Sequence, residues 1–222
     1  MALNNVLYGG LPQGSLTQPL SEYFNRQKIL APKVELILAF STHGSAEDAN
    51  WVEEFYLDAD VYVPEMANWT PQGIERFQKV ARGDSDAPCI VETYTQNVLS
   101  ETHNITRHYG AALMKMLARS SGKHLCAIDV PAGTELGNRL RTARAYVGIY
   151  PQALRELLRL QKPRETQMIL NLSPALGSLL RTHPELCSKE TLKVLLTLGS
   201  DHKNISKPLA KRGEHVRCFF KS

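Results

Sequence analysis

Short hydrophobic runs of strand length alternate along this chain with segments of helical periodicity. Runs rich in Val, Ile and Leu predict strands at residues 34–40, 59–63, 125–130, 192–198 and 215–220. Capping residues and apolar residues at helical spacing predict helices at residues 46–57, 71–81, 104–120, 152–160, 164–180 and 204–212. Strands that alternate with helices favour right-handed crossovers. We therefore expect an α/β fold with a mainly parallel central sheet flanked by helices and a final strand at the C-terminus.

The remaining segments set the domain boundary. Residues 1–33 hold three prolines and three glycines with little periodicity, and predict an irregular lead-in with one helical stretch near Leu20–Gln27. Residues 34–222 are expected to form a single α/β domain. Within it, residues 82–103 are polar and are expected to be irregular, and Pro174 is expected to kink or divide the helix at 164–180.

Composition narrows the class of protein. Hydrophobic residues make up 43% of the chain, enough for a core, yet none of its runs reaches the ~18 apolar residues of a membrane span. The N-terminal M-A-L-N-N-V-L-Y-G-G has no basic segment and no long apolar stretch, so we expect no secretory signal and a cytoplasmic protein. The four cysteines are scattered without C-x-x-C spacing and predict buried free thiols: Cys89, Cys126, Cys187 and Cys218.

Charge is unevenly distributed between the two halves. Residues 1–102 have a net charge of −8 and residues 103–222 a net charge of +12, so the halves either neutralise each other or leave a basic surface for an anion. Basic and aromatic residues are not interleaved in the basic half, so we do not expect nucleic acid as a partner. Walker, G-x-G-x-x-G, G-x-S-x-G and zinc-finger motifs are absent from the sequence, which argues against an NTPase, a dinucleotide enzyme and an elbow-type serine hydrolase.

Two histidines follow strand-like runs far apart in the sequence. His43 ends V-E-L-I-L-A-F-S-T-H, and His202 ends L-K-V-L-L-T-L-G-S-D-H. Glu65 follows the strand-like V-Y-V-P, and Arg164 follows Pro163 at the predicted start of a helix. Because the carboxyl ends of parallel strands meet at one sheet edge, we expect these four side chains to converge there.

Two kinds of chemistry fit this set. Two imidazoles and a carboxylate (His43, Glu65, His202) form a three-ligand set for a divalent metal with an open position for water. Without a metal, an imidazole would act as general base toward water, and Arg164 would either hold Glu65 or clamp a developing oxyanion. Each residue taken alone also has a structural interpretation, such as a turn histidine or a solvated surface charge.

Other polar residues are assigned lesser roles. Asp129, which ends a predicted strand, and Ser200 and Asp201, which precede His202, are expected to support the four from behind. Lysines at i, i+4 spacing beside His202 predict a solvated helix face or a surface that attracts an anionic substrate: Lys203, Lys207 and Lys211. The other histidines lack partners at metal-ligand spacing in the sequence and are expected to be structural or exposed: His103, His108, His124, His183 and His215.

The order of the four residues resembles the superfamily that contains the TraB/PrgY proteins, the Tiki proteases, the ChaN haem-binding proteins and the erythromycin esterases. Residues 199–202 (G-S-D-H) match its second G-x-x-H motif, residues 163–168 (P-R-E-T-Q-M) its arginine element, and residues 61–65 (V-Y-V-P-E) its glutamate element. Residues 40–43 (F-S-T-H) depart from its first G-x-x-H because phenylalanine replaces glycine. The resemblance covers residues 34–220.

The resemblance and the residues together imply two functions. The first is a hydrolase of ester or peptide bonds that acts on a small molecule or peptide, with or without a divalent metal. The second is a non-catalytic protein on the same scaffold that binds haem, a metal or another small ligand. The substrate, the metal and the oligomeric state stay open. We also expect either histidine to be replaceable by alanine at little cost in stability, because each is placed for chemistry.

Overall fold

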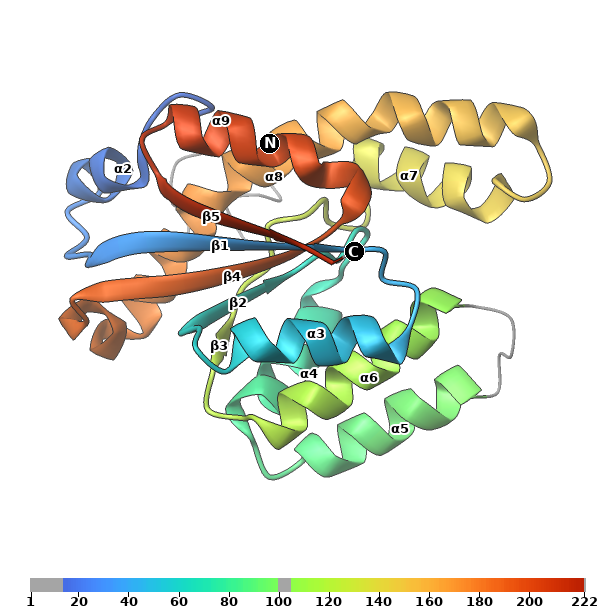
Figure 1. Ribbon diagram of the computed structural model, residues 1–222, viewed down its shortest axis with the longest axis horizontal. Helices are drawn as coiled ribbons and strands as arrows, with labels where there is room; N and C mark the ends of the chain where they lie inside the picture. Colours follow the sequence, from blue (N-terminus) through green and yellow to red (C-terminus); the bar gives the residue numbers. More distant parts are fainter. Residues whose placement is uncertain (1–13, 100–104, 222) are drawn as a thin grey trace.

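The protein folds around a twisted sheet of parallel strands (Figure 1). The computed structural model describes residues 14–99 and 105–221, and every statement below concerns that part of the chain. The described strands pair in the order β3-β2-β4-β1-β5, each parallel to its neighbour. Their bounds are β1 Lys33–Ser41, β2 Val61–Pro64, β3 His124–Leu125, β4 Thr191–Gly199 and β5 His215–Phe220. The expected α/β class, with its C-terminal final strand, is confirmed.

Helices cover both faces of this sheet (Figure 1). One face carries α2 (Leu20–Arg26), α8 (Pro151–Thr182) and α9 (Ser206–Lys211). The other carries α3 (Ala46–Tyr56), α4 (Pro71–Arg82), α5 (Ala87–Leu99) and α6 (Ile105–Arg119). Helix α7 (Glu135–Tyr146) lies along the first half of α8, and 3₁₀ turns η1 (Pro184–Ser188) and η2 (Ser200–Ile205) flank β4.

Strand β1 shows why both faces need cover. Leu36, Leu38 and Phe40 point into the core under α2, α8 and α9. Ile37 and Ala39, which alternate with them, point into the core under α3, α4 and α6. A strand buried on both faces reads as a continuous apolar run, as this one does. The strand ends are thus held rigidly by packing on both sides.

Three local predictions were wrong, and one helix was not predicted. Residues 82–103, expected to be irregular, contain α5, because Ala87, Ile90 and Val91 pack against the α4–α6 layer. The strand expected at 125–130 is limited to β3, whose pairing with β2 ends at Tyr62 and Leu125. Helix α7 was not predicted, although Thr134 caps it by accepting a hydrogen bond from the backbone of Gly137.

The fourth difference concerns α8. Helices expected at 152–160 and 164–180 are one continuous helix of 32 residues that includes Pro163 and Pro174. Arg164 therefore lies in the interior of a helix and does not open one. Proline removes one backbone hydrogen bond from a helix, and the long packed face of α8 tolerates that loss.

Smaller expectations have mixed outcomes. All four cysteines are free, but of these Cys126 is buried while Cys89 and Cys218 are exposed. The helical stretch in the lead-in is α2, whose Leu20, Tyr23 and Phe24 join the core. Residues 1–13 lie outside the described residues. None of the described helices is both long and apolar enough to cross a membrane.

Candidate functional site

The carboxyl ends of β1, β2 and β4 bring three of the predicted residues together. His43 follows β1, Glu65 follows β2, and His202 lies in η2 after β4. His43 Nδ1 is 3.8 Å from Glu65 Oε2, and His202 Nε2 is 3.3 Å from Glu65 Oε1. The expected convergence at one sheet edge is confirmed, with the glutamate between the two imidazoles.

Arg164 reaches the same place from α8. Its Nη2 donates to Glu65 Oε1 at 2.7 Å, and its Nη1 lies 2.9 Å from His202 Nε2. Its Nε and Nη2 donate to the two carboxylate oxygens of Asp129 at 2.9 and 2.5 Å. Each guanidinium nitrogen is thus engaged by a site side chain. Of the two roles predicted for Arg164, this arrangement fits the one that holds Glu65.

Asp129 supports Arg164 from behind. Asp129 is fully buried, and its Oδ1 also accepts a hydrogen bond from the backbone N–H of Val130 at 2.7 Å. A buried arginine between two carboxylates is a paired charge, as burial requires. The position of Asp129 agrees with the supporting role expected for it.

Glu65 is fixed as an anion. Its Oε2 accepts a hydrogen bond from the backbone N–H of Gly199 at 2.5 Å, and its own N–H donates to the Thr197 carbonyl at 3.0 Å. Burial raises the pKa of the carboxyl, but the charge of Arg164 and the hydrogen bond of His202 outweigh it. The pKa of Glu65 therefore lies well below its usual value.

His202 is a buried imidazole between two carboxylates. Besides Glu65 at its Nε2, it has Glu165 Oε1 3.2 Å from its Nδ1. Burial lowers the pKa of His202, but the hydrogen bond and charge of Glu65 outweigh it, so the pKa is raised above 6.5. The neutral ring accepts from Arg164 at Nε2 and donates to Glu165 from Nδ1. In the protonated ring Nε2–H would donate to Glu65 instead, and would then lie close to the donating Nη1 of Arg164.

His43 has the opposite character. Its ring stacks on Tyr109, with centroids 4.5 Å apart and planes inclined by 11°. Its Nε2 is buried and has no hydrogen-bond partner among the described residues. Burial lowers the pKa of His43 below 6.5, and the charges of Glu65 and Asp48 only partly offset it. At neutral pH the ring is thus an uncharged base with an unused nitrogen.

The backbone of His43 is held in an unusual conformation. Its φ of 53° lies in the left-handed region, which costs a non-glycine residue about 1 kcal/mol or more. Asp48 fixes the loop by accepting hydrogen bonds from the Thr42 hydroxyl and the Gly44 backbone at 3.0 and 2.7 Å. Lys221 pairs with the other oxygen of Asp48 at 2.6 Å. Strain that is maintained by such contacts is typical of functional positions.

The predicted three-ligand metal set does not fit this geometry. Arg164 already contacts Glu65 Oε1 and His202 Nε2, which are the atoms a metal would need, so a cation there would meet a buried guanidinium. Among the described residues, His43, Glu65 and His202 also do not form a group whose donor atoms all lie within 4.8 Å of one another. We therefore derive no metal-dependent step for them.

Two predicted supporting residues are misplaced, and two contributors were missed. Ser200 and Asp201 are exposed, and no contact links them to the four site side chains in the described structure, because the η2 turn buries His202 and Ile205 instead. Glu165 adjoins Arg164 in the sequence, which was the only available signal for it. Tyr109 lies on α6, and its apolar spacing indicated core packing alone. Its stacking on His43 depends on tertiary structure.

Two of the remaining histidines do find partners. His124 and His183 meet Glu185, which corrects the expectation that they stand without ligand partners. Sequence spacing could not reveal this, because β3 and the end of α8 are brought together by the fold. His215 is exposed beside Glu35. His103 lies outside the described residues, as does the side chain of His108.

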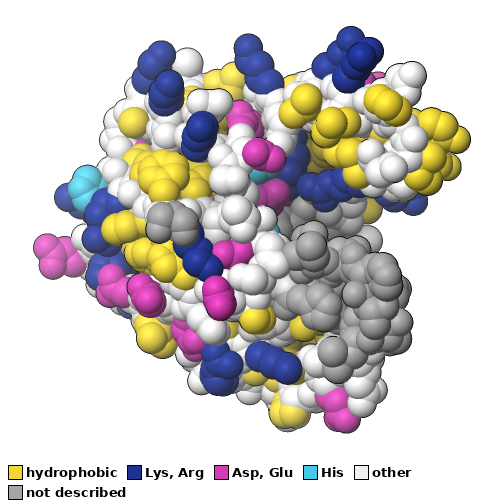
Figure 2. Space-filling model, turned by 45° about the vertical axis from the view of Figure 1, so that its right-hand side comes forward, with side chains coloured by type: hydrophobic (Ala, Val, Ile, Leu, Met, Phe, Trp, Pro, Cys, Tyr) yellow, Lys and Arg dark blue, Asp and Glu magenta, His cyan; other side chains and the backbone are white. Residues whose placement is uncertain are grey.

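The surface is hollowed on the side where the strands end. Figure 2 shows Lys or Arg side chains at the rim of this hollow, with acidic side chains and a histidine inside. Arg144 of α7 is exposed, and it lies close enough to Arg164, Glu65 and Asp129 for their charges to act on its pKa. The residue reaches solvent, but its guanidinium is surrounded by protein atoms, and this loss of solvation, followed by the charge of Arg164, lowers the pKa of Arg144. The three lysines predicted beside His202 are also exposed, divided between η2 and α9.

Comparisons of the chain with protein-family models, curated proteins and solved structures find no match. The likeness to the TraB, Tiki, ChaN and erythromycin esterase superfamily therefore rests on the short motifs alone.

Proposed function

We propose that this protein is a hydrolase that activates water with His43 to cleave an ester or peptide bond of a small substrate. The observation that carries the proposal is the unpaired, buried Nε2 of a neutral imidazole beside a fixed carboxylate. An unpaired buried nitrogen costs about 1–3 kcal/mol, so its retention favours a functional role. A base oriented by a third group is the arrangement that hydrolases use.

In this proposal His43 carries the proton. Water adds to the carbonyl carbon as its proton passes to Nε2 of His43, and the resulting imidazolium returns a proton to the departing alkoxide or amine. Glu65, 3.8 Å from Nδ1, stabilises the imidazolium during the interval. Because burial keeps the resting ring neutral, the base is ready at pH 7.

His202, Arg164 and Asp129 position the carboxylate. His202 and Arg164 contact Glu65 Oε1, the oxygen away from His43, and Asp129 holds Arg164. All three are buried, so in this proposal they do not meet the substrate. Arg144 is the cation suited to the developing oxyanion, because it is exposed and has no ion-pair partner among the described residues. The four predicted catalytic residues thus divide into one proton carrier and three that hold it in place.

A binding protein on the same scaffold is the second candidate. The stacked His43–Tyr109 pair favours it, since a flat ring pair beside an unpaired nitrogen also suits a small planar ligand or haem. The two candidates differ in turnover. A binder would take up its ligand stoichiometrically, with a change in visible spectrum for haem, and release no product.

The test is a panel of chromogenic esters and short peptides with parent, His43→Gln and His215→Gln proteins. His215 is a matched control because it also adjoins a glutamate, but at the opposite end of the sheet. We expect turnover by the parent and the control, and a loss in kcat/KM of about 10²–10⁴-fold for His43→Gln. Chelator treatment should leave the rate unchanged. Turnover that survives His43→Gln would contradict the proposal, and haem binding without turnover would favour the second candidate.

A further inference from the structure

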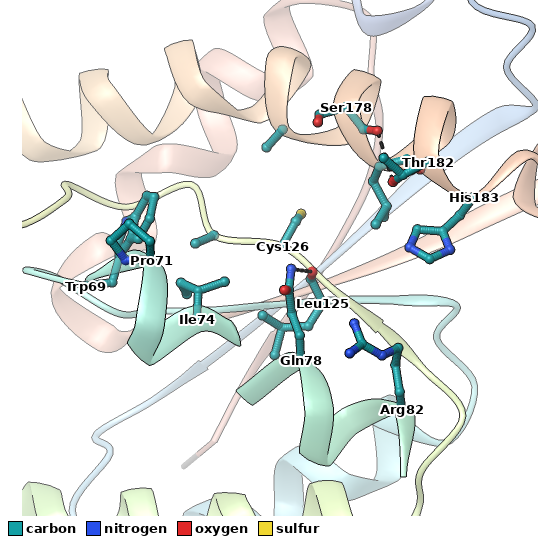
Figure 3. Close-up of a pocket in the computed structure, with 13 residues that line it drawn as sticks. Trp69, Pro71, Ile74, Gln78, Arg82, Leu125, Cys126, Ser178, Thr182 and His183 are labelled. Carbon is teal, nitrogen blue, oxygen red and sulfur yellow. Dashed lines mark hydrogen bonds between the residues drawn. The ribbon is translucent and has the colours of Figure 1, made fainter. Parts of the chain in front are cut away.

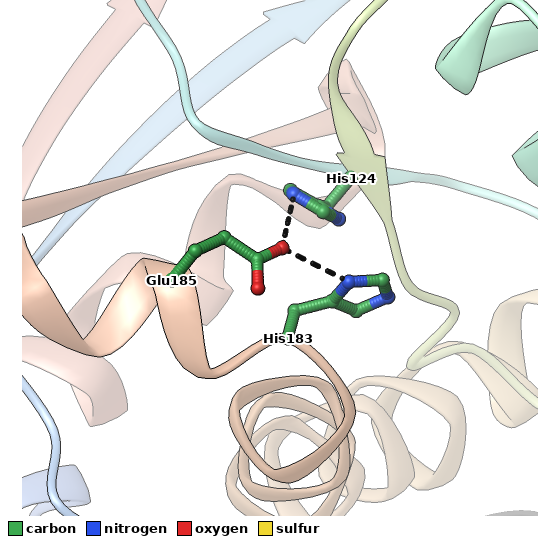
Figure 4. Close-up of side chains that lie close together, drawn as sticks. All are labelled: His124, His183 and Glu185. Carbon is green, nitrogen blue, oxygen red and sulfur yellow. Dashed lines mark hydrogen bonds and ion pairs between the residues drawn. The ribbon is translucent and has the colours of Figure 1, made fainter.

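Three potential metal ligands meet at the end of the sheet where the strands begin, opposite the candidate active site. His124 lies in β3, at the end where the strands begin, while His183 and Glu185 stand where α8 passes into η1 (Figure 4). Figure 4 shows both rings directed toward the Glu185 carboxylate. Among the described residues this is the group of His, Cys and carboxylate donors whose atoms all lie within 4.8 Å of one another.

The distances suit a tetrahedral ion. His124 Nε2 lies 3.5 Å from Glu185 Oε1, and His183 Nδ1 lies 3.2 Å from the same oxygen. Two ligands that bind zinc at its usual bond lengths in tetrahedral geometry are about 3.3 Å apart, between these two values. The two rings have centroids 4.2 Å apart and are tilted by 53°, so they do not stack face to face. Only small side-chain rotations would bring the three donors onto one ion.

The backbone that carries the ligands is rigid. The His183 N–H donates to the Leu179 carbonyl at 2.8 Å, and the His183 carbonyl accepts from Leu186 at 3.1 Å. Pro184 restricts the chain between the two ligands, and Leu186 is buried just beyond them. On the other side, β3 is fixed by its pairing with β2. Ligands on fixed elements lose little freedom when they bind.

The charge of Arg82 opposes positive charge at His124, but Arg82 and Lys189 are themselves paired with carboxylates. Arg82 acts on His124 but is paired with Asp84 at 2.7 Å, and Lys189 is paired with Asp60 at 2.9 Å. The site is also open, because the side chains of His183 and Glu185 are 30% and 60% exposed. Metal can therefore enter from solvent, and a fourth position is free for water.

We propose that His124, His183 and Glu185 bind a divalent transition metal, with zinc the best match to two imidazoles and one carboxylate. The ion would fasten β3 to the end of α8. His183 also lines a cleft of about 400 Å³ in which it faces Arg82 at one end, with Trp69 at the other (Figure 3). The open metal position lies beside this cleft. This proposal does not depend on the proposed hydrolase activity, because the residues of that site lie at the carboxyl ends of the strands.

The test is metal binding by the chelator-treated chain of this sequence, with Zn²⁺ followed by calorimetry and Co²⁺ by its visible absorption. Variants His183→Ala and Glu185→Gln remove one ligand each. Both positions are partly exposed, so the variants should fold, as circular dichroism would verify. His215→Ala is the matched control, because His215 also lies 3.5 Å from a glutamate but belongs to no three-ligand group among the described residues. His43→Ala controls for the other sheet edge.

We expect one equivalent of metal to bind and raise the melting temperature. His183→Ala and Glu185→Gln should each weaken binding by at least about tenfold and abolish the tetrahedral Co²⁺ spectrum. Both controls should bind as the parent does. The proposal is overturned if the parent binds no metal, if both ligand variants bind as tightly as the parent, or if His43→Ala alone removes the metal.

Discussion

Arg164 Nη2 donates a 2.7 Å hydrogen bond to Glu65 Oε1 although 99 positions separate the two residues in the sequence. The same nitrogen also contacts Asp129, so one buried cation is shared by the buried carboxylate of Asp129 and the carboxylate of Glu65, which is 11% exposed. This pairing holds Glu65 between His43 and His202. Both the stability of the domain and the basicity of the two histidines depend on it.

The first prediction concerns this buried pairing. Arg164→Met should lower the free energy of unfolding by about 3–5 kcal/mol, because it leaves Glu65 and Asp129 buried without their cation. Urea unfolding measures the change. Arg139→Met is the control, since Arg139 forms an exposed pair with Glu156 and its loss should cost about 1 kcal/mol or less. Equal costs for the two variants would mean that the Arg164 network does not stabilise the fold.

The second prediction separates the two histidines by pH. The pKa of His202 is raised in the folded state, so its contribution to stability is present below about pH 6.5 and is lost as the pH rises through the folded pKa. His202→Gln should therefore lower the free energy of unfolding more at about pH 6 than at about pH 9, which lie below and above the reference pKa of histidine. Denaturant unfolding at several pH values measures this difference.

The third prediction is the opposite trend for His43. Its folded pKa is lowered, so the folded state resists protonation, and stability is lost as the pH falls below about 6.5. His43→Gln removes that loss and should cost less at acidic pH than at neutral pH. Parallel profiles for the two variants would contradict the assignment of opposite environments to the two rings.

The surroundings of the two rings also change one expectation from the sequence. His43 and His202 looked equivalent as strand-end histidines, each replaceable by alanine at little cost. In the structure His202 is 1% exposed and has three polar partners, so its removal leaves buried groups unpaired. His43 has an unpaired nitrogen and is closer to the original expectation. Sequence position showed where each ring lies but not what surrounds it.

Sequence patterns predicted the layout of this site better than its details. Strand ends located His43, Glu65 and His202, because parallel strands must deliver such residues to one edge. The contacts of Tyr109 and Glu165 with the two histidines could not be predicted, because they join α6 and α8 to segments far away in the sequence. The His124–His183–Glu185 group escaped for the same reason. Local propensity also placed a helix start at Arg164, where tertiary packing instead carries α8 through Pro163.

The fourth prediction tests Arg144 as the cation for the oxyanion. Arg144→Gln should lower kcat by about 10²-fold or more on any substrate that the parent cleaves, because charge stabilisation acts in the transition state. KM should change less. Arg141→Gln on the same helix is the matched control and should retain the parent kcat. A loss confined to KM would assign Arg144 to substrate binding instead.

The fifth prediction concerns the continuity of α8. If Pro163 opened a helix, as the sequence suggested, replacing it by alanine would be nearly neutral, because proline suits the first helical position. In the structure Pro163 is exposed in the helix interior, so Pro163→Ala restores a backbone hydrogen bond to the Arg159 carbonyl. We expect a gain of about 1–3 kcal/mol in urea unfolding. Pro174→Ala is the comparison, since Pro174 is buried and its replacement also leaves a cavity that offsets the gain. An unchanged or lower stability for Pro163→Ala would indicate two helices rather than one.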